Sequence, residues 1–500
     1  MHRTIGLIST MSPDQTWAPE VLDRVAATHA VVKGTLEPLG FEVLDEGPLH
    51  RSFSEMAEAG KRLGCRGIKA LVVYVGTWTY ANAAAAAALE AKVPVVIWAD
   101  ATPGTCGLVG GTIARGAMAE LGLHAHLVCG LFDDAPTQHR VRSLLAAACA
   151  ATGLRGQVLG LGGGRSMGML TAVCDPNAVR RQFGVEIDQF EQMEVIARAE
   201  QLPDERAAPF LNWMRETFGE IVAAEDVLVR QIKLYLALEA LCAERGYDCV
   251  AVKCLPELPG IHTTFCLAHA LMGDAADARG PKGRFIFACE ADLNAALTMQ
   301  ILKLLQDGPV LFTDLTEFDL ESGLLTTCNC GSQPTDFARD KREVRWEREG
   351  VHEFEWRYGG TCPQHVARAG RATLARLSRD RGRYEMLIAP AEVVEMPREK
   401  LRETVWERPH AYLRLLCDRD EFLEAVRANH IHLVYGDYAA ELAEVCAILG
   451  VRPVLVGGAI GASPVGQVAR PAGRPTAGLA TRATDGSAVG DDCGGGADAH

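Results

Sequence analysis

The chain has 500 residues, of which 48% are hydrophobic and 23% charged, and its formal net charge is −14 at pH 7. This length is too great for one hydrophobic core and predicts about three domains. The acidic balance argues against nucleic-acid binding, which needs a basic surface, and no apolar run approaches the ~20 residues needed to cross a bilayer.

The first 150 residues alternate apolar runs with amphipathic or alanine-rich stretches, which is the pattern of a doubly wound parallel sheet. The expected strands are residues 4–9, 41–44, 70–75, 95–98 and 124–129. The alanine run at 83–88 favours a helix. Because the first apolar run is too short for a secretory leader, we expect a cytoplasmic protein whose 16 cysteines are mostly reduced and buried.

A second α/β unit begins near Gly156. Its expected elements are a strand at 158–161, a helix at 227–244 stopped by Gly246, and strands at 249–253 and 285–290. The glycine run after the first strand lacks dinucleotide-binding spacing, because the third glycine would fall at Arg165 or Met167.

Short β-like runs between about 326 and 397 predict a β-rich third domain. After Val456 the chain turns to glycine, alanine, proline and serine, which predicts a disordered tail. The predicted boundaries are 1–152, 153–308, 309–468 and 469–500.

Two carboxylates stand where apolar runs end. Glu290 closes the run at 285–289, and Asp314 closes the run at 310–313. In α/β folds the carboxyl ends of strands face the ligand crevice, so both side chains are expected there. Downstream, Asn429 and His430 add an amide and an imidazole. Two carboxylates and one imidazole suit a divalent metal with positions left open for substrate.

Other interpretations stay open at this level. The alternative interpretation of Glu290 is a structural one: its negative charge is favourable near a helix N-terminus, with Asp292 as the helix cap. The alternative interpretation of His430 is a histidine at a helix C-terminus, where its positive charge is favourable. If 431–435 is a strand, His430 and His432 share a face, and either could be the ligand.

Three cysteines and a histidine form a second candidate metal site in the sequence. Cys328, Cys330, Cys362 and His365 could bind structural zinc, although the first pair is spaced too closely for the usual knuckle. Buried thiols are the favoured interpretation.

Several segments carry a family resemblance. They are residues 163–169, 183–186, 253–258, 289–292, 296–299 and the Asn429-His430 pair. In these the chain resembles the L-fucose isomerase family, and its fucose/arabinose isomerase-like branch in particular. The resemblance implies two Rossmann-like domains followed by a C-terminal domain that contains a β-barrel. It also implies a homohexamer.

For the site, the resemblance implies a manganese centre held by Glu290, Asp314 and His430, with Mg²⁺ or Co²⁺ as alternatives. The two carboxylates are then both ligands and general acid/base on opposite sides of an enediol. Asn329 stands where relatives of this branch often carry histidine, which leaves the identity of the sugar open.

Five further residues are candidates for contact with substrate. Asn429 is a donor to a sugar hydroxyl, with a turn residue as the alternative. Glu257 and Lys253 are expected at or just beyond the end of the strand at 249–253, facing the same crevice, where they orient substrate or pair with each other. Arg165 has a similar pair of interpretations. Trp17 and Trp78 would stack on a sugar, with ordinary packing as the alternative. In the related hexamers the first domain reaches a neighbour's site.

The sequence therefore predicts an Mn²⁺-dependent aldose–ketose isomerase acting on a monosaccharide such as L-fucose, D-arabinose or a modified sugar. The alternatives are a metal-dependent aldolase or epimerase, and a sugar-binding or sensing protein without catalysis. No nucleic acid or membrane partner is expected.

Overall fold

The computed structural model describes residues 3–13, 17–329, 331, 333–348, 359–403 and 408–457. By their contacts, residues 1–460 form one compact unit. The predicted tail from 469 lies outside the described residues, and the predicted boundaries at 152, 308 and 468 stay predictions. Within the described residues no helix is long and apolar enough to cross a membrane.

The first sheet is parallel throughout and follows the order β2-β1-β3-β4-β5. Its strands are β1 (Thr4–Thr10), β2 (Glu42–Asp45), β3 (Ala70–Val75), β4 (Val95–Asp100) and β5 (Ala125–Gly130). The five predicted strands are thereby confirmed. The helices are α1 (Pro19–Leu36), α2 (Phe53–Cys65), α3 (Ala81–Ala91), α4 (Gly107–Glu120) and α5 (Ala135–Gly153).

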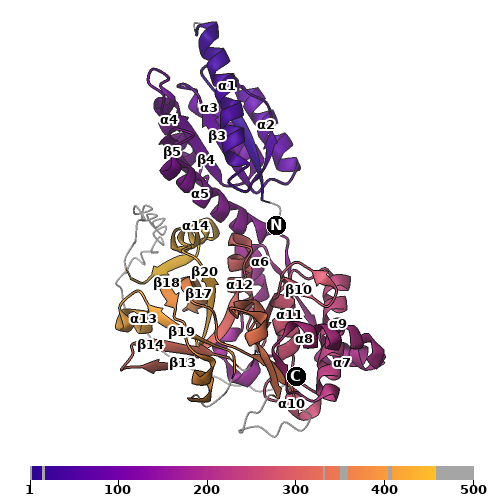
Figure 1. The fold of residues 1–500 in the computed structure, drawn as a ribbon. Helices are drawn as coiled ribbons and strands as arrows, with labels where there is room; N and C mark the ends of the chain where they lie inside the picture. Colours follow the sequence, from indigo (N-terminus) through magenta and orange to yellow (C-terminus); the bar gives the residue numbers. More distant parts are fainter. Residues whose placement is uncertain are drawn as a thin grey trace, which may run out of the picture. The chain divides into compact units, whose positions relative to one another are not determined.

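Both faces of this sheet are covered by helices, which explains why β3 and β4 are apolar at nearly every position. One apolar cluster joins strand residues to α2, α3 and α4, and a second joins the alternate strand residues to α1 and α5. Figure 1 shows these helices packed around the strands. Helices α2 and α3 are in close contact at Gly60, where an added Cβ would lie 2.2 Å from the carbonyl oxygen of Ala87.

The second sheet is also parallel, in the order β12-β9-β6-β7. Its strands are β6 (Val158–Gly162), β7 (Glu186–Phe190), β9 (Cys249–Val252) and β12 (Ile286–Cys289). The helices of this part are α6 (Pro176–Phe183), α7 (Gln192–Gln201), α8 (Ala208–Thr217), α9 (Glu225–Arg245), α10 (Leu258–Ile261), α11 (Cys266–Gly273) and α12 (Leu293–Leu305). Gly246, with a φ of +65°, ends α9 as predicted.

The third sheet has seven strands in the order β17-β20-β13-β14-β19-β18-β21, and β17 also pairs with β18. The strands are β13 (Leu311–Asp319), β14 (Leu324–Cys328), β17 (Gly370–Asp380), β18 (Arg383–Val393), β19 (His410–Leu415), β20 (His430–Tyr435) and β21 (Arg452–Leu455), with helices α13 (Arg419–Ala425) and α14 (Ala439–Leu449). The predicted strand-rich C-terminal part is confirmed, and the β-barrel stays a prediction.

Smaller elements complete the described residues. The short strands are β8 (Glu220–Ile221), β10 (Ala276–Asp277), β11 (Gly280–Pro281), β15 (Arg345–Arg348) and β16 (Thr361–Gln364). The 3₁₀ turns are η1 (Ser166–Gly168), η2 (Leu170–Ala172), η3 (Asp204–Arg206), η4 (Thr335–Phe337), η5 (Lys341–Glu343) and η6 (Arg398–Glu403).

Asp314 was expected to be the last residue of its strand, and this was wrong. Strand β13 continues to Asp319, because the residues after Asp314 pair with β14 in an antiparallel hairpin. The strand changes character at Asp314: Leu311 to Thr313 are buried, and the residues from Asp314 to Asp319 are partly or fully exposed. Asp314 thus marks the point where the strand leaves the core.

Helix α12 connects the second and third sheets. It contacts β12 and β9 on one side and β17, β20 and β13 on another. Its residues belong to one apolar cluster with both sheets, and eleven of its thirteen residues are buried. The carboxyl end of β12 and the start of β20 are therefore held close to the same helix.

Candidate metal centre

Three side chains with metal-binding atoms converge at the start of α12. One donor atom each from Glu290, Asp314 and His430 lies within 4.8 Å of the other two. His430 Nε2 is 3.3 Å from Glu290 Oε2 and 3.5 Å from Asp314 Oδ1. Glu290 and His430 are buried, whereas the Asp314 side chain is 28% exposed. One ligand of the set is therefore reachable from solvent.

Strand pairing explains part of this convergence. Asp314 on β13 and His430 on β20 are direct partners in the antiparallel register. Side chains that stand opposite each other on adjacent antiparallel strands lie on the same face, about 5 Å apart at Cβ. Glu290 arrives separately, as the residue after β12 in the second sheet. The third ligand-type residue thus comes from a different sheet.

The turn that delivers Glu290 is strained. Glu290 and Ala291 have φ values of +58° and +52°. The left-handed conformation costs about 1–2 kcal/mol for each residue with a Cβ. Such conformations persist where the surrounding structure fixes them, and they concentrate at functional sites.

Asp292 both begins α12 and orients His430. Asp292 is the N-cap of α12, and its Oδ1 accepts a hydrogen bond from the backbone amide of Ala295 at 2.9 Å. Its Oδ2 lies 2.7 Å from His430 Nδ1 and 2.8 Å from Arg376 Nη2. Because an ionised carboxylate only accepts hydrogen bonds, Nδ1 carries the proton and Nε2 is directed at Glu290 and Asp314. This is how histidine ligands are usually held.

Buried charges keep that carboxylate ionised. Burial alone would raise the pKa of Asp292, but the charge on Arg376 and the hydrogen bond from His430 outweigh it and hold the pKa well below its usual range. Sequence reasoning placed Asp292 only as a helix cap and did not single out Arg376, which reaches the site from β17.

Two asparagines bind the carboxylates of the set. Asn329 Nδ2 donates to Asp314 Oδ2 at 2.6 Å and to Glu290 Oε1 at 3.2 Å. Asn429 Nδ2 donates to Asp314 Oδ1 at 2.7 Å. Asn329 follows β14, whose last residue, Cys328, pairs with Asp314 across the sheet. The residue noted as a departure from relatives therefore bridges two members of the set.

These residues fit a divalent cation. The buried Nε2 of His430 makes no hydrogen bond of good geometry within the described residues, although two carboxylate oxygens face it. Burial would lower the pKa of His430, but Asp292, Glu290 and Asp314 raise it to about 10, so the surroundings favour a positive charge at this point. Two carboxylates and one imidazole suit Mn²⁺ or a similar ion.

His432 lies on the same strand face in a different environment. It is buried, and its Nε2 is 3.3 Å from Arg376 Nη1. Burial and the charge on Arg376 hold the pKa of His432 well below its usual value. His432 is not a member of the clustered set formed by Glu290, Asp314 and His430.

Arg165 and Glu257 follow the carboxyl ends of β6 and β9, at the same edge of the second sheet where Glu290 follows β12. The strands β6, β9 and β12 end level with one another, with Gly162 and Cys289 both paired to Val252. Glu257 accepts a hydrogen bond from Lys253 at 2.8 Å and is exposed, which matches the pairing alternative. Arg165 is exposed just before η1.

The two tryptophans lie in the first sheet's part of the chain. Trp17 is partly buried and packs against the apolar cluster of α1 and α5. The Trp78 ring is 5.6 Å from the ring of Tyr80, which is half exposed. Their role toward a sugar stays a prediction.

Three of the four residues of the candidate zinc site lie within the described residues. Cys328, Cys362 and His365 are buried, and burial lowers the pKa of His365 to about 3. Among the described residues these three do not form a clustered ligand set. Cys330 lies outside the described residues. Most of the cysteines in the described ranges are buried, as predicted.

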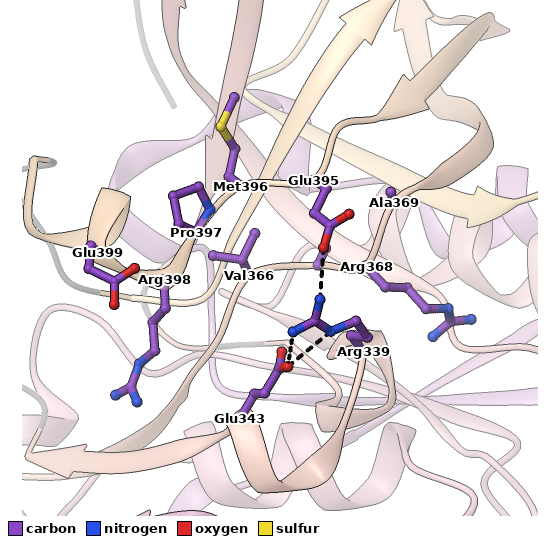
Figure 2. Close-up of a pocket in the computed structure, with 11 residues that line it drawn as sticks. Arg339, Glu343, Val366, Arg368, Ala369, Glu395, Met396, Pro397, Arg398 and Glu399 are labelled. Atoms are coloured by element: carbon purple, nitrogen blue, oxygen red, sulfur yellow. Dashed lines mark hydrogen bonds and ion pairs between the residues drawn. The ribbon is translucent and has the colours of Figure 1, made fainter.

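A cavity of about 820 Å³ lies elsewhere in the third part of the chain. It is lined by three arginines, Arg339, Arg368 and Arg398, together with glutamates, and Arg339 is paired with Glu343 and Glu395 (Figure 2). None of the residues of the Glu290 set lines it.

Known proteins resemble this chain in sequence. Residues 327–455 match the sequence model of the L-fucose isomerase C-terminal domain. Two relatives are named sulfoquinovose isomerase. The one from Alkalicoccus urumqiensis is 23% identical over 368 residues, covering 71% of this chain and 78% of its own. The one from Clostridium sp. (strain MSTE9) is 25% identical over 391 residues, covering 73% and 81%. The predicted resemblance to the L-fucose isomerase family is confirmed.

Solved structures add little. A periplasmic solute-binding protein from Actinobacillus succinogenes 130z with bound D-allose covers 54% of this chain and 82% of its own, at 13% identity. Its TM-score of 0.16 is too low to bear on the fold.

Proposed function

Since this chain carries the C-terminal domain of the L-fucose isomerase family and is a sugar isomerase, we propose that it interconverts an aldose and a ketose with a divalent cation held by Glu290, Asp314 and His430. The observation that carries the proposal is the convergence of two carboxylates and one oriented imidazole at a strained turn. Mn²⁺ is the proposed ion, because two hard carboxylate ligands and one imidazole match its preferences.

The reaction moves one proton between C1 and C2 while the carbonyl moves in the opposite direction. When bound, the cation would act as a Lewis acid that polarises the carbonyl and offsets enediolate charge, an effect of several kcal/mol. The chain must supply the base and acid for the proton. Glu290 and Asp314 are the carboxylates within reach of one another, and we assign them this role.

The neighbours of the two carboxylates support distinct positions for them. Asn329 donates to both, so it fixes their relative placement without adding charge. Asp314 is the more exposed of the pair, which makes it the one that faces arriving substrate. Glu290 is buried behind it, and burial excludes competing water from that side.

His430 has a supporting role. With Nδ1 bound to Asp292, its Nε2 is fixed toward the carboxylates and cannot rotate to serve as a proton carrier. We therefore assign it to cation binding alone. Arg376 keeps Asp292 ionised, and so maintains the orientation of the imidazole.

The substrate is proposed as a monosaccharide aldose. The relatives named sulfoquinovose isomerase put a sulfonated sugar first among candidates, with L-fucose and D-arabinose next. At 23–25% identity the residues that select the sugar are free to differ.

A panel of these aldoses, incubated with Mn²⁺-loaded protein in D₂O, tests the function. We expect one aldose to give its ketose with deuterium at C1 or C2, detected by NMR. Cleavage of the sugar or inversion at C2 would assign the chain to the aldolase or epimerase alternative. Binding of sugar with no exchange of hydrogen would assign it to the sensing alternative.

A further inference from the structure

A second group of metal-binding side chains lies far from Glu290 in the sequence. His124 immediately precedes β5, and His126 lies within it. Because successive strand residues point to opposite faces, residues 124 and 126 share a face. Their rings are 5.2 Å apart. Opposite them, Glu444 extends from α14, more than 300 positions later in the chain.

The three side chains converge on one oxygen atom. His124 Nε2 is 2.5 Å from Glu444 Oε1, and His126 Nε2 is 2.7 Å from the same oxygen. Donor atoms of all three lie within 4.8 Å of one another. The Glu444 side chain is 6% exposed, and those of His126 and His124 are 19% and 32% exposed. The group is therefore built on a buried carboxylate and opens toward solvent at His124.

We propose that His124, His126 and Glu444 form a second metal site, suited to Zn²⁺ and similar ions, that ties β5 to α14. Two imidazoles and one carboxylate are a known zinc ligand set, and the fourth tetrahedral position remains open to water. The donor atoms of a tetrahedral zinc site lie about 3.3 Å apart, given metal–ligand distances near 2.0–2.1 Å. The two nitrogen–oxygen distances, 2.5 and 2.7 Å, are shorter than this, and small side-chain rotations would lengthen them to the spacing of a zinc site.

Ligand chemistry separates this site from the Glu290 set. The Glu290 set has two carboxylates and one imidazole, which suits Mn²⁺. The His124 set has two imidazoles and one carboxylate, which favours ions later in the first transition series, with Zn²⁺ well above Mn²⁺. The sites share no residue, so each can be removed by mutation while the other is kept.

The alternative is a metal-free clamp, in which both imidazoles donate to Glu444. Burial raises the pKa of Glu444, but hydrogen bonds and charge from the two histidines lower it to about 2, so the carboxylate is ionised in either case. Helix α14 also contacts α5 nearby, where Ser143 Oγ donates to Glu441 Oε1 at 2.6 Å. Glu441 is as buried as Glu444 but lies outside the donor set, which makes it a matched control.

The experiment uses the full chain, stripped with a chelator and then loaded with Zn²⁺. The wild-type protein and Glu441→Gln should each retain two Zn²⁺ per chain, measured by mass spectrometry of the metal. The double variant H124Q/H126Q should retain one, and E290Q/D314N should also retain one. Co²⁺ in place of Zn²⁺ should give the intense visible absorption of a four-coordinate site in E290Q/D314N, and this band should be absent when His124 and His126 are also replaced.

Equal Zn²⁺ content in wild type and H124Q/H126Q would overturn the proposal, as would complete loss of Zn²⁺ in E290Q/D314N. If the double variant does not fold, His124→Gln alone, at the most exposed of the three positions, should weaken Zn²⁺ binding at least tenfold in E290Q/D314N. Thermal melting gives a readout independent of catalysis. Zn²⁺ should raise the melting temperature of E290Q/D314N by several degrees and leave E290Q/D314N/H124Q/H126Q unchanged.

Discussion

At the scale of single residues, the centre depends on a division of roles among neighbouring groups. In the proposed mechanism Glu290 and Asp314 supply charge and bases, while Asn329 hydrogen-bonds to both carboxylates and Asp292 holds His430. The sequence indicated the two carboxylates and Asn429-His430, because each stands beside an apolar run. It could not indicate Arg376 or the bridge made by Asn329, because those contacts exist only once β17 and β14 are placed beside the site.

Removing either carboxylate charge should abolish most activity. Glu290→Gln and Asp314→Asn keep the size of each side chain but remove a ligand charge and a base, so turnover should fall by roughly two orders of magnitude or more. Steady-state kinetics at saturating Mn²⁺ measures this. Glu317→Gln, an exposed change on the same strand as Asp314, is the control and should leave turnover unchanged. Near-normal turnover in either carboxylate variant would exclude it from the centre.

The two histidines of β20 should behave differently toward metal. His430→Gln removes the nitrogen that faces both carboxylates, so Mn²⁺ affinity should fall about 10–100-fold or more, with partial rescue of activity by excess Mn²⁺. His432→Gln changes a residue that packs beside Arg376 and should act mainly on stability. Isothermal calorimetry compares the two. A larger loss of Mn²⁺ affinity in His432→Gln would reverse the assignment.

At the scale of elements, apolar periodicity located the five strands of the first sheet and β6, β9 and β12 of the second, because strands buried on both faces are nearly continuous in hydrophobic residues. It did not locate β7, an edge strand whose residues are mostly exposed. The extent of β13 was not predictable in the same way. Its second half is half exposed and is held by pairing with β14, so the local sequence after Asp314 shows no buried run. The left-handed turn at Glu290 and Ala291 was also hidden, because neither residue is glycine.

The contact between α2 and α3 allows a prediction about stability. Gly60→Ala would place a methyl group 2.2 Å from a backbone oxygen of α3, so the helices must separate, and the free energy of unfolding should fall by about 1–3 kcal/mol. Gly116→Ala, at an exposed position of α4 with no atom near the added Cβ, should instead raise it by about 0.5–1 kcal/mol. Denaturant unfolding of both variants decides this, and equal effects would contradict the close packing of α2 on α3.

At the scale of the whole molecule, the second and third sheets supply the clustered residues of the site, and α12 connects these two sheets. The additional pairing of β17 with β18 returns the third sheet to its first strand, which supports the β-barrel implied by the family resemblance. Three apolar residues of α4 are exposed, Leu108, Val109 and Ile113, and we predict that another copy of the chain covers them.

We predict a homo-oligomer, with a hexamer as the expected state, because closed symmetry repeats one interface and covers such surfaces in every copy. Light scattering at micromolar protein measures the mass directly. A variant with Val109→Glu should dissociate at least in part, whereas Ala119→Glu, exposed ten positions further along the same helix, is the control for added charge. A fully active monomer would contradict the prediction and would remove the proposed role of Trp17 and Trp78 in a neighbour's site.

The link between the Glu290, Asp314 and His430 centre and proton transfer is tested most directly by deuterium incorporation with and without metal. Protein that has been exhaustively chelated is incubated with its aldose in D₂O, before and after addition of Mn²⁺. The predicted result is no ketose and no deuterium at C1 or C2 in the chelated protein, and both after Mn²⁺ is restored. Equal incorporation in the two samples would contradict a metal-dependent isomerase.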